Sequence, residues 1–114
     1  GKKDVTLIKN ELNISNEIVV FEGFFDYLTF KNLEKTENSN SDYIILNSTS
    51  MLFKVEETLK KYDKISLFLD NDKNGNATKK AILKKYENVE DCSLIYQKFK
   101  DLNEWFCNDD CRSF

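Results

Sequence analysis

The hydrophobic positions of this chain fall into short continuous runs, separated by longer segments in which apolar residues recur at helical spacing. Continuous runs of this length, rich in β-branched and aromatic residues, predict strands. The predicted strands are Ile18 to Phe21, Tyr43 to Leu46, Ile65 to Leu69 and Ser93 to Tyr96. The third run is apolar except for Ser66, as in parallel strands that are buried on both faces. Val5 to Ile8 is a candidate for an additional edge strand.

Helices are predicted between and after these strands. They cover Phe24 to about Lys35, Met51 to about Tyr62, the segment from Gly75 to about Tyr86, and a short stretch from about Asp101. The hydroxyl groups of Ser48 to Ser50 suit an N-cap at the start of the second helix. Four β-α units in a row predict an α/β fold with a central, mostly parallel sheet of about four strands and helices on both faces.

The apolar side chains of the predicted helices are expected to pack against the sheet. They are Phe24, Phe25, Leu28 and Leu33 in the first helix, Leu52, Val55, Leu59 and Tyr62 in the second, and Leu102, Trp105 and Phe106 in the last. Several aromatic rings have an alternative use as platforms on which bases stack, namely Phe24, Phe25, Tyr27, Phe30 and Trp105. Their helical spacing favours packing in the core.

Size and residue types narrow the class of protein. The 114 residues, 40% of them apolar, suit one compact domain with a single core. No apolar run approaches the roughly 18 residues of a membrane span, so no membrane partner is expected. Three cysteines and no histidine argue against a disulfide scaffold, a zinc site, and Ser-His or Cys-His nucleophiles. A reduced, cytoplasmic location is expected.

The charge balance argues against strong nucleic-acid binding by this chain alone. Its formal net charge is −3, whereas proteins that bind phosphate backbones usually carry a basic surplus. Arg112 is the only arginine, which argues against bidentate readout of bases. Four lysines of the third predicted helix are expected to form a solvated face or, alternatively, to follow a nucleic-acid path: Lys79, Lys80, Lys84 and Lys85. Binding of DNA or RNA is therefore expected to need metal ions or neighbouring domains.

Acidic residues stand where a parallel sheet binds its ligands, beyond the carboxyl ends of the strands. Glu22 ends the first predicted strand, Asp70 ends the third, and Asp72 follows two residues later. In an extended segment Asp70 and Asp72 point to the same side, so three carboxylates would repel one another. A hard divalent cation removes that repulsion, and Mg²⁺ combines a few carboxylates with water or phosphate oxygens. The pattern favours metal-assisted phosphoryl transfer over hydride or acyl transfer.

The segment Asp70 to Gly75 has other interpretations. Asp, Asn and Gly also make ordinary turns, because their side chains bond the local backbone. An EF-hand loop is excluded, because Ala81 stands where a bidentate Glu is required and a strand-like run precedes the segment. A haloacid dehalogenase-type site would use the first Asp as its nucleophile. That motif normally follows the first strand, whereas Asp70 follows the third, so it is kept as a minor alternative.

Four segments together resemble the motifs of the TOPRIM family. Ile18 to Asp26 resembles an apolar strand followed by Glu-Gly-x-x-Asp, and Leu67 to Gly75 resembles an apolar strand followed by Asp-x-Asp-x-x-Gly. Ile45 to Thr49 is similar to the strand and turn between them, although Asn47 replaces the usual glycine. Lys100 to Asn103 resembles the later Lys-Asp-x-Asn/Asp element. The resemblance spans about residues 17–106, so the chain, 1–114, is interpreted as a single TOPRIM domain of a longer protein.

The resemblance implies a Rossmann-like TOPRIM fold and roles for the acidic residues. Glu22 would act as a general acid or base or as a metal ligand, and Asp70 and Asp72 would coordinate Mg²⁺ or Mn²⁺. Asp26, one helical turn after Glu22, would join the same acidic cluster. The residues expected beside the substrate phosphates are Lys73, Ser48, Thr49, Asp101 and Asn103.

Within the TOPRIM family, the chain most resembles the primase branch, because Glu-Gly-Phe-Phe-Asp, with its aromatic pair before the Asp, resembles the primase form of the first motif. It is similar in particular to the primase-like proteins of plasmids and mobile elements. This resemblance implies metal-dependent nucleotidyl transfer on DNA or RNA in replication or mobile-element maintenance, with nucleoside triphosphates as candidate partners. The zinc-binding and template-binding domains of primases are not in this chain, so little activity is expected in isolation. Two alternatives stay open: an OLD-type nuclease, and a non-catalytic DNA- or protein-binding module as in RecR-type repair proteins.

Overall fold

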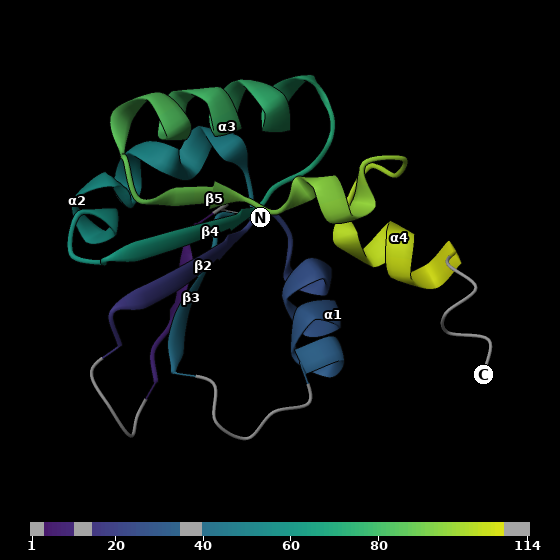
Figure 1. The fold of residues 1–114 in the computed structure, drawn as a ribbon, viewed down its shortest axis with the longest axis horizontal. Helices are drawn as coiled ribbons and strands as arrows, with labels where there is room; N and C mark the ends of the chain where they lie inside the picture. Colours follow the sequence, from purple (N-terminus) through teal and green to yellow (C-terminus); the bar gives the residue numbers. More distant parts are fainter. Residues whose placement is uncertain (1–3, 11–14, 35–39, 109–114) are drawn as a thin grey trace.

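The chain folds as a central sheet with helices on both faces (Figure 1), and the computed structural model describes residues 4–10, 15–34 and 40–108. The strands are β1 (Thr6–Ile8), β2 (Glu17–Phe21), β3 (Ser41–Ile45), β4 (Lys64–Phe68) and β5 (Val89–Asp91). The helices are α1 (Phe24–Glu34), α2 (Glu56–Leu59), α3 (Lys73–Lys85) and α4 (Leu102–Asn108), with two 3-10 helices, η1 (Thr49–Lys54) and η2 (Ser93–Tyr96). None of the helices in the described ranges has the length and apolar character needed to cross a bilayer.

The sheet has the order β1-β3-β2-β4-β5, and the predicted α/β class with a mostly parallel sheet is confirmed. Strands β2 to β5 run parallel to their neighbours, whereas β1 pairs with β3 in the antiparallel direction. The additional edge strand brings the count to five. Phe21 is in register with Ile45 of β3 and Phe68 of β4. The central strands β2, β3 and β4 therefore end side by side, and the residues after them meet at one edge.

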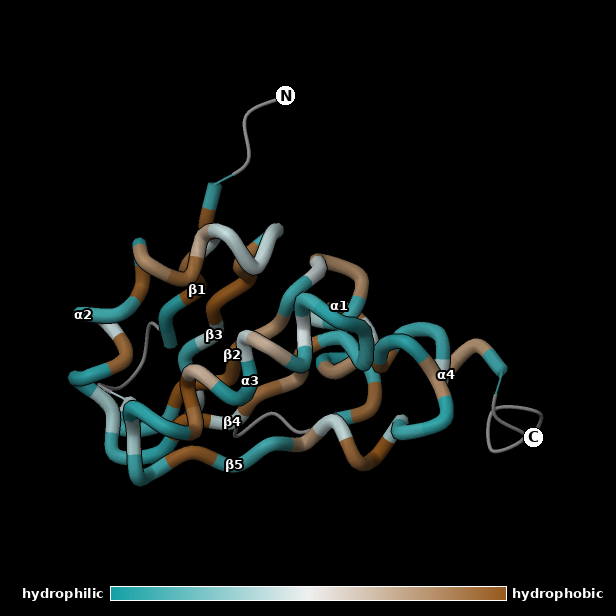
Figure 2. The backbone as a smooth tube through the Cα atoms, turned by 90° about the horizontal axis from the view of Figure 1, so that it is seen from above, coloured by the Kyte–Doolittle hydropathy of each residue, from teal (hydrophilic) through white to brown (hydrophobic). Residues whose placement is uncertain are grey.

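The core lies on both faces of the sheet, which explains why the central strands are continuously apolar. Ile18 and Val20 of β2 pack into one cluster with residues of η1, α2 and α3, whereas Val19 and Phe21 pack on the opposite face with residues of α1, η2 and α4. In Figure 2 the hydrophobic segments gather around the strands in the middle of the molecule. Each fully buried aliphatic or aromatic side chain contributes about 1.5–3 kcal/mol.

The fourth predicted strand is wrong, because Ser93–Tyr96 forms the 3-10 helix η2 and the last strand is Val89–Asp91. The chain turns at the end of β5, where the Ser93 backbone N–H donates to Asp91 Oδ1 (2.9 Å). The apolar residue Leu94, which made the segment look like a strand, is 70% exposed. Only Ser93 and Tyr96 of this short helix are buried.

The second predicted helix, Met51 to Tyr62, is broken into η1 and α2. Ser48 caps η1 as expected, since its Oγ accepts from the Ser50 backbone N–H (3.3 Å). Val55, between the two helices, has φ −112° and ψ 0°, which interrupts regular helical geometry. The apolar face predicted for this region is nevertheless confirmed. Its members Val55, Leu59 and Tyr62 are buried, and Leu52 packs against the same cluster.

The apolar face predicted for α1 is wrong. The four residues assigned to it are 41–69% exposed: Phe24, Phe25, Leu28 and Leu33. The helix instead turns Tyr27 and Phe30 toward the sheet, and the Phe30 ring lies 5.2 Å from the Phe68 ring. Its buried residues are Asp26 and Thr29, whose polar groups form hydrogen bonds with α4. Burial of that polar pair fixes the rotation of the helix and leaves the first phenylalanines outside.

The lysines of α3 do not form one solvated face. Lys80, Lys84 and Lys85 are exposed, and Lys85 forms an ion pair with Glu56 at 2.7 Å. Lys79 is buried, which contradicts the prediction made for it.

Candidate metal centre

The centre begins where β2 and β4 end next to each other. Residue Glu22 directly follows β2, and Asp70 follows β4 after one further buried residue, Leu69. The backbone N–H of Asp70 donates to Glu22 Oε1 at 3.1 Å, which ties the two strand ends together. The Tyr96 hydroxyl donates to the carbonyl of Leu69 at 2.7 Å. The parallel register and these bonds bring two carboxylates from distant parts of the sequence to one edge.

Asp72 is held by the start of α3. Its Oδ1 accepts from the Gly75 backbone N–H at 2.8 Å, so Asp72 is the N-cap of the helix. Gly75 packs so closely on the preceding loop that an added Cβ would lie 2.0 Å from the carbonyl oxygen of Asp70. The Asp-x-Asp-x-x-Gly pattern therefore has a local cause: the first Asp meets Gly75 through its backbone, and the second caps the helix that Gly75 belongs to.

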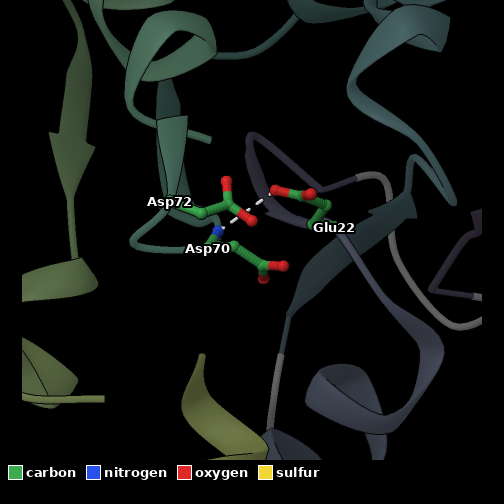
Figure 3. A group of neighbouring side chains, drawn as sticks. All are labelled: Glu22, Asp70 and Asp72. Carbon is green, nitrogen blue, oxygen red and sulfur yellow. Dashed lines mark hydrogen bonds between the residues drawn. The ribbon is translucent and has the colours of Figure 1, made fainter. Parts of the chain in front are cut away.

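Carboxylate oxygens of Glu22, Asp70 and Asp72 lie within 4.8 Å of one another. Figure 3 shows Glu22 facing the two aspartates across the loop after β4, with its bond to the Asp70 backbone. A second group with the same spacing contains Asp26, Asp70 and Asp101. Asp70 belongs to both groups, so it lies at the centre of five carboxylates. The structure thus brings the four predicted metal ligands together and adds Asp101 to them.

Burial and mutual repulsion raise the pKa values of these acids. The pKa of Asp70 is raised to about 7, first by burial and then by the charges of the four other carboxylates. Burial is also the main reason why the pKa of Asp26 is raised to about 6, with Asp101 and Glu22 adding to it. The pKa of Glu22 is raised chiefly by burial, against the lowering effect of its bond from the Asp70 N–H. A crowded set of acids of this kind is costly to ionise without a cation.

The atoms at the centre fit a hard divalent cation. Asp70 is only 9% exposed, and within the described ranges its Oδ1 is buried without a hydrogen-bond partner. Buried polar atoms are normally paired, so an unpaired oxygen on a carboxylate that other carboxylates surround marks a place for a positive ion. The donors are all oxygen atoms, which suits Mg²⁺ or Mn²⁺ and not a soft, thiolate-binding metal.

Asp26 is held in place by α4. Its Oδ1 accepts from the Asn103 backbone N–H at 3.0 Å, and the Asn103 side-chain oxygen accepts from Thr29 Oγ1 at 2.9 Å. Asp101 caps the same helix, because its Oδ1 accepts from the Glu104 N–H at 2.8 Å. The predicted substrate-side residues Asp101 and Asn103 thus have structural roles at the start of α4 in addition to their place at the centre.

A hollow of about 300 Å³ opens over the second carboxylate group. It is lined by Glu22, Gly23, Phe24, Phe25, Asp26, Asn47, Asp70, Asp101 and Asn103. Two of these residues that sequence reasoning assigned to the core, Phe24 and Phe25, are 50% and 69% exposed. Asn47 was named only as a turn residue. Its φ of 64° is in the left-handed region that asparagine tolerates, and its N–H donates to the Glu22 carbonyl at 2.9 Å.

The remaining substrate-side predictions have a different outcome. Ser48, Thr49 and Lys73 are not among the residues that line the hollow, and the Ser48 hydroxyl bonds to Ser50 instead. Sequence reasoning did not assign Lys100 to the site, although it is part of the Lys-Asp-x-Asn element. Its Nζ lies 4.0 Å from Asp72 Oδ2. Both groups are partly exposed, so this ion pair contributes little to stability.

The fold has relatives among solved structures. It is similar to the primase fragment of the bacteriophage T7 primase-helicase protein, with a TM-score of 0.64 and 23% identity over 82% of this chain and 40% of that chain. A second similar chain comes from a structure of the bacteriophage T7 lagging-strand DNA polymerase interacting with primase domains of two gp4 subunits bound to an RNA/DNA hybrid and dTTP. The TM-score is 0.62, with 23% identity over 86% of this chain and 50% of that chain. A third similar structure is that of a small TOPRIM domain protein from Bacillus stearothermophilus, with a TM-score of 0.56 and 15% identity over 80% of this chain and 75% of that chain.

These likenesses, at 15–23% identity, show a shared fold. The chain spans less than two thirds of both bacteriophage T7 chains, at 40% and 50% of their lengths. No curated protein matches its sequence. The profile of the Toprim-like family, in contrast, matches residues 19–106, which include all five carboxylates of the centre and reach from β2 into α4. The chain therefore belongs to the Toprim-like family.

Proposed function

We propose that this domain binds Mg²⁺ or Mn²⁺ on Glu22, Asp70 and Asp72, with Asp26 beside them, and supports nucleotidyl or phosphoryl transfer in a primase-like protein. The observation that carries the proposal is the environment of Asp70. Its carboxylate is buried among four others, and one oxygen has no hydrogen-bond partner in the described part of the chain. Such a group is costly to keep charged unless a cation joins it.

The residues of the chain prepare a position for a phosphate group. A divalent cation, when bound, stabilises the charge on phosphate oxygens during an in-line displacement. The ends of β2 and β4 hold Glu22 and Asp70 next to each other, and the cap of α3 holds Asp72. Asp26 extends the acidic surface toward α4. Hydrogen bonds with backbone N–H groups fix these carboxylates. The side chains would therefore need little rearrangement to receive the cation and its phosphate ligand.

Nucleic acid or a nucleoside triphosphate is the substrate class that the surroundings favour. Phe24 and Phe25 line the same hollow as the carboxylates and expose their rings. Exposed aromatic rings stack on bases of any sequence, and here they lie next to the position proposed for phosphate. The net charge of −3 gives the chain little attraction for a phosphate backbone, so the cation and other domains would supply it.

The metal claim is tested by titrating Mn²⁺ into the chain and following paramagnetic broadening by NMR. We expect the signals of Glu22, Asp70 and Asp72 to broaden first, and Asp70→Asn to remove that selectivity. The exposed residue Asp63 offers a matched control, because Asp63→Asn makes the same chemical change before the start of β4, whereas the centre follows the end of that strand. Sharp signals at the three acids while other positions broaden would overturn the metal site.

Catalysis is tested in the full-length protein, by assays of primer synthesis and of nicking with Asp70→Asn and Asp63→Asn. If Asp70→Asn loses primer synthesis and Asp63→Asn retains it, the result supports the primase-like function. An OLD-type nuclease would lose nicking instead, since it would use the same acids. Unchanged activity in Asp70→Asn would favour a binding module of the RecR type.

A further inference from the structure

Lys79, on the buried side of α3, is a cation that has no carboxylate partner among the described residues. Its Nζ donates to Asn71 Oδ1 at 2.7 Å, Asn76 Oδ1 at 2.9 Å and Ser93 Oγ at 3.0 Å. None of the ion pairs among the described residues includes it. Three neutral oxygens thus satisfy the three protons of a buried ammonium group. Burying a charge in this way is costly, so the arrangement calls for a reason.

The reason lies in the side chain of Asn71, which stands between the two aspartates of the Asp-x-Asp motif. Its Nδ2 lies 3.4, 3.1 and 3.1 Å from the carbonyl oxygens of Ser93, Tyr96 and Phe99, and its backbone N–H donates to the Lys100 carbonyl at 2.6 Å. One asparagine therefore joins the loop after β4 to four carbonyl groups of η2 and the turn that follows it.

Lys79 and the three carbonyl groups together decide which way the Asn71 amide points. An amide has one oxygen, which only accepts, and one nitrogen, which only donates. If the amide of Asn71 were reversed, its oxygen would face three carbonyl oxygens and its nitrogen would face the Lys79 ammonium. The charged donor on α3 therefore holds the oxygen on its own side and the nitrogen on the side of η2.

The hydrogen bonds of Asn71 with Lys79 and with η2 lie between the two parts of the metal centre. On one side, Asp70 and Asp72 flank Asn71 directly. On the other, the segment bonded by Asn71 leads into Lys100, whose Nζ lies 4.0 Å from Asp72 Oδ2, and into Asp101, which shares the second carboxylate group with Asp70. A shift of the turn after η2 would therefore change the spacing of the second carboxylate group and the distance from Lys100 to Asp72.

We propose that Lys79 and Asn71 form a positioning pair that sets the spacing between the Asp70–Asp72 loop and the Lys100–Asp101 segment, and so the metal affinity of the centre. The inference rests on the proposed function, because it assigns the pair to that metal site. Groups that orient ligands without touching the metal typically change metal affinity by about 10- to 100-fold when they are removed.

The direction of the effect separates positioning from charge. If Lys79 acted only as a nearby positive charge, its removal would relieve repulsion and raise the affinity for Mn²⁺. If it positions the ligands, Lys79→Met lowers the affinity, and Asn71→Ala does the same although it leaves the lysine charge in place. Ile82→Val, in the core on the same helix, controls for a general loss of stability, and Lys80→Met removes an exposed charge.

The test measures free Mn²⁺ by electron paramagnetic resonance with the full chain, with Asp70→Asn as the baseline for loss of the site. We expect about a tenfold weaker affinity or more in Lys79→Met and in Asn71→Ala, with both controls close to wild type. Wild-type or tighter binding in these two variants would overturn the positioning pair while leaving the metal site intact. A wild-type chain that retains no Mn²⁺ would overturn the metal site and this inference with it. If Lys79→Met does not fold, Asn71→Ala decides between the first two outcomes.

Discussion

Gly75 shows how a single residue holds the acidic loop in shape. In the interior of a helix, replacing glycine by alanine normally adds stability, by about 1 kcal/mol. At Gly75 we expect the substitution to lower stability instead, because the new Cβ would lie 2.0 Å from the Asp70 carbonyl oxygen. The backbone of the loop from Asp70 to Asp72 cannot move away without pulling Asp70 from Glu22, whose hydrogen bond to the Asp70 N–H is 3.1 Å long.

We expect Gly75→Ala to lower the free energy of unfolding by roughly 1–3 kcal/mol, as overpacking against a fixed neighbour does. Gly23→Ala is the matched control, because its Cβ would meet Asp26 Oδ2 at an ordinary 3.4 Å. Urea denaturation of both variants measures the difference. Equal stability of the two variants would show that the loop yields and that Gly75 is not required by packing.

The pKa of Asp70 gives a second prediction, for the metal-free chain. Its pKa in the folded state, about 7, lies above the ordinary value of 3.8, so the folded chain binds more protons between these values. A shift of one pKa unit corresponds to about 1.36 kcal/mol. The free energy of unfolding should therefore fall by roughly 2–4 kcal/mol as the pH rises from about 4 to 7. Asp26, with a pKa of about 6, changes stability in the same direction.

Asp70→Asn should flatten this dependence and leave the chain more stable than wild type at pH 8 in EDTA. Urea denaturation at pH 5 and pH 8 measures it, with Asp63→Asn as the control that keeps the wild-type slope. Wild-type stability that rose between these two pH values would contradict the raised pKa.

Single residues were predictable from the sequence where their role follows from a strand end or a cap. Glu22 and Asp70 come just after the ends of two parallel strands, and the register of β2 and β4 brings them together. Asn71 was not predictable, because its partners Lys79 and Ser93 depend on how α3 and η2 lie relative to the loop. Spacing along the chain carries no information about such a contact.

At the scale of elements, two of the errors share a cause, namely apolar residues that do not face the core. Leu94 and Ile95 make Ser93–Tyr96 look like a strand, yet both are exposed on η2. Phe24 and Phe25 give α1 an apparent core face on its outer side. Periodicity reports where hydrophobic residues recur, and it assigns them to the core because burial is their usual use. An element that uses them at the surface is misread for that reason.

The exposed phenylalanines at the start of α1 are therefore candidates for stacking on bases, and this role can be tested. We expect Phe25→Ala to weaken binding of a fluorescent single-stranded oligonucleotide by the full-length protein in Mg²⁺, by about 1 kcal/mol or fivefold, because one stacking ring is lost. Phe53→Ala is the control, since Phe53 of η1 is 66% exposed against 69% for Phe25 and does not line the hollow. Fluorescence anisotropy measures both affinities. An equal loss in the two variants would indicate a general surface effect, and no loss in Phe25→Ala would remove this ring from the substrate site.

At the scale of the whole molecule, the class of the fold was accessible because it depends on element order. Alternating strands and helices predict a parallel sheet, and a parallel sheet places its strand ends at one edge. The five carboxylates come from the end of β2, from α1, from the loop after β4 and from the start of α4. Their convergence is a property of the complete fold, so binding at this centre should stabilise all of these elements together.

The final prediction follows from that convergence. A cation that binds only the folded chain raises the free energy of unfolding by about 2.7 kcal/mol at 100 times its Kd. We expect Mg²⁺ or Mn²⁺ to do so at pH 8 and to do less at pH 5, where protons occupy Asp70 and Asp26. Thermal or urea unfolding with and without metal measures the gain, and Asp63→Asn should retain it. Asp70→Asn should be more stable than wild type in EDTA and gain nothing from metal. A variant that lost stability in EDTA would instead show that Asp70 serves the fold and not a cation.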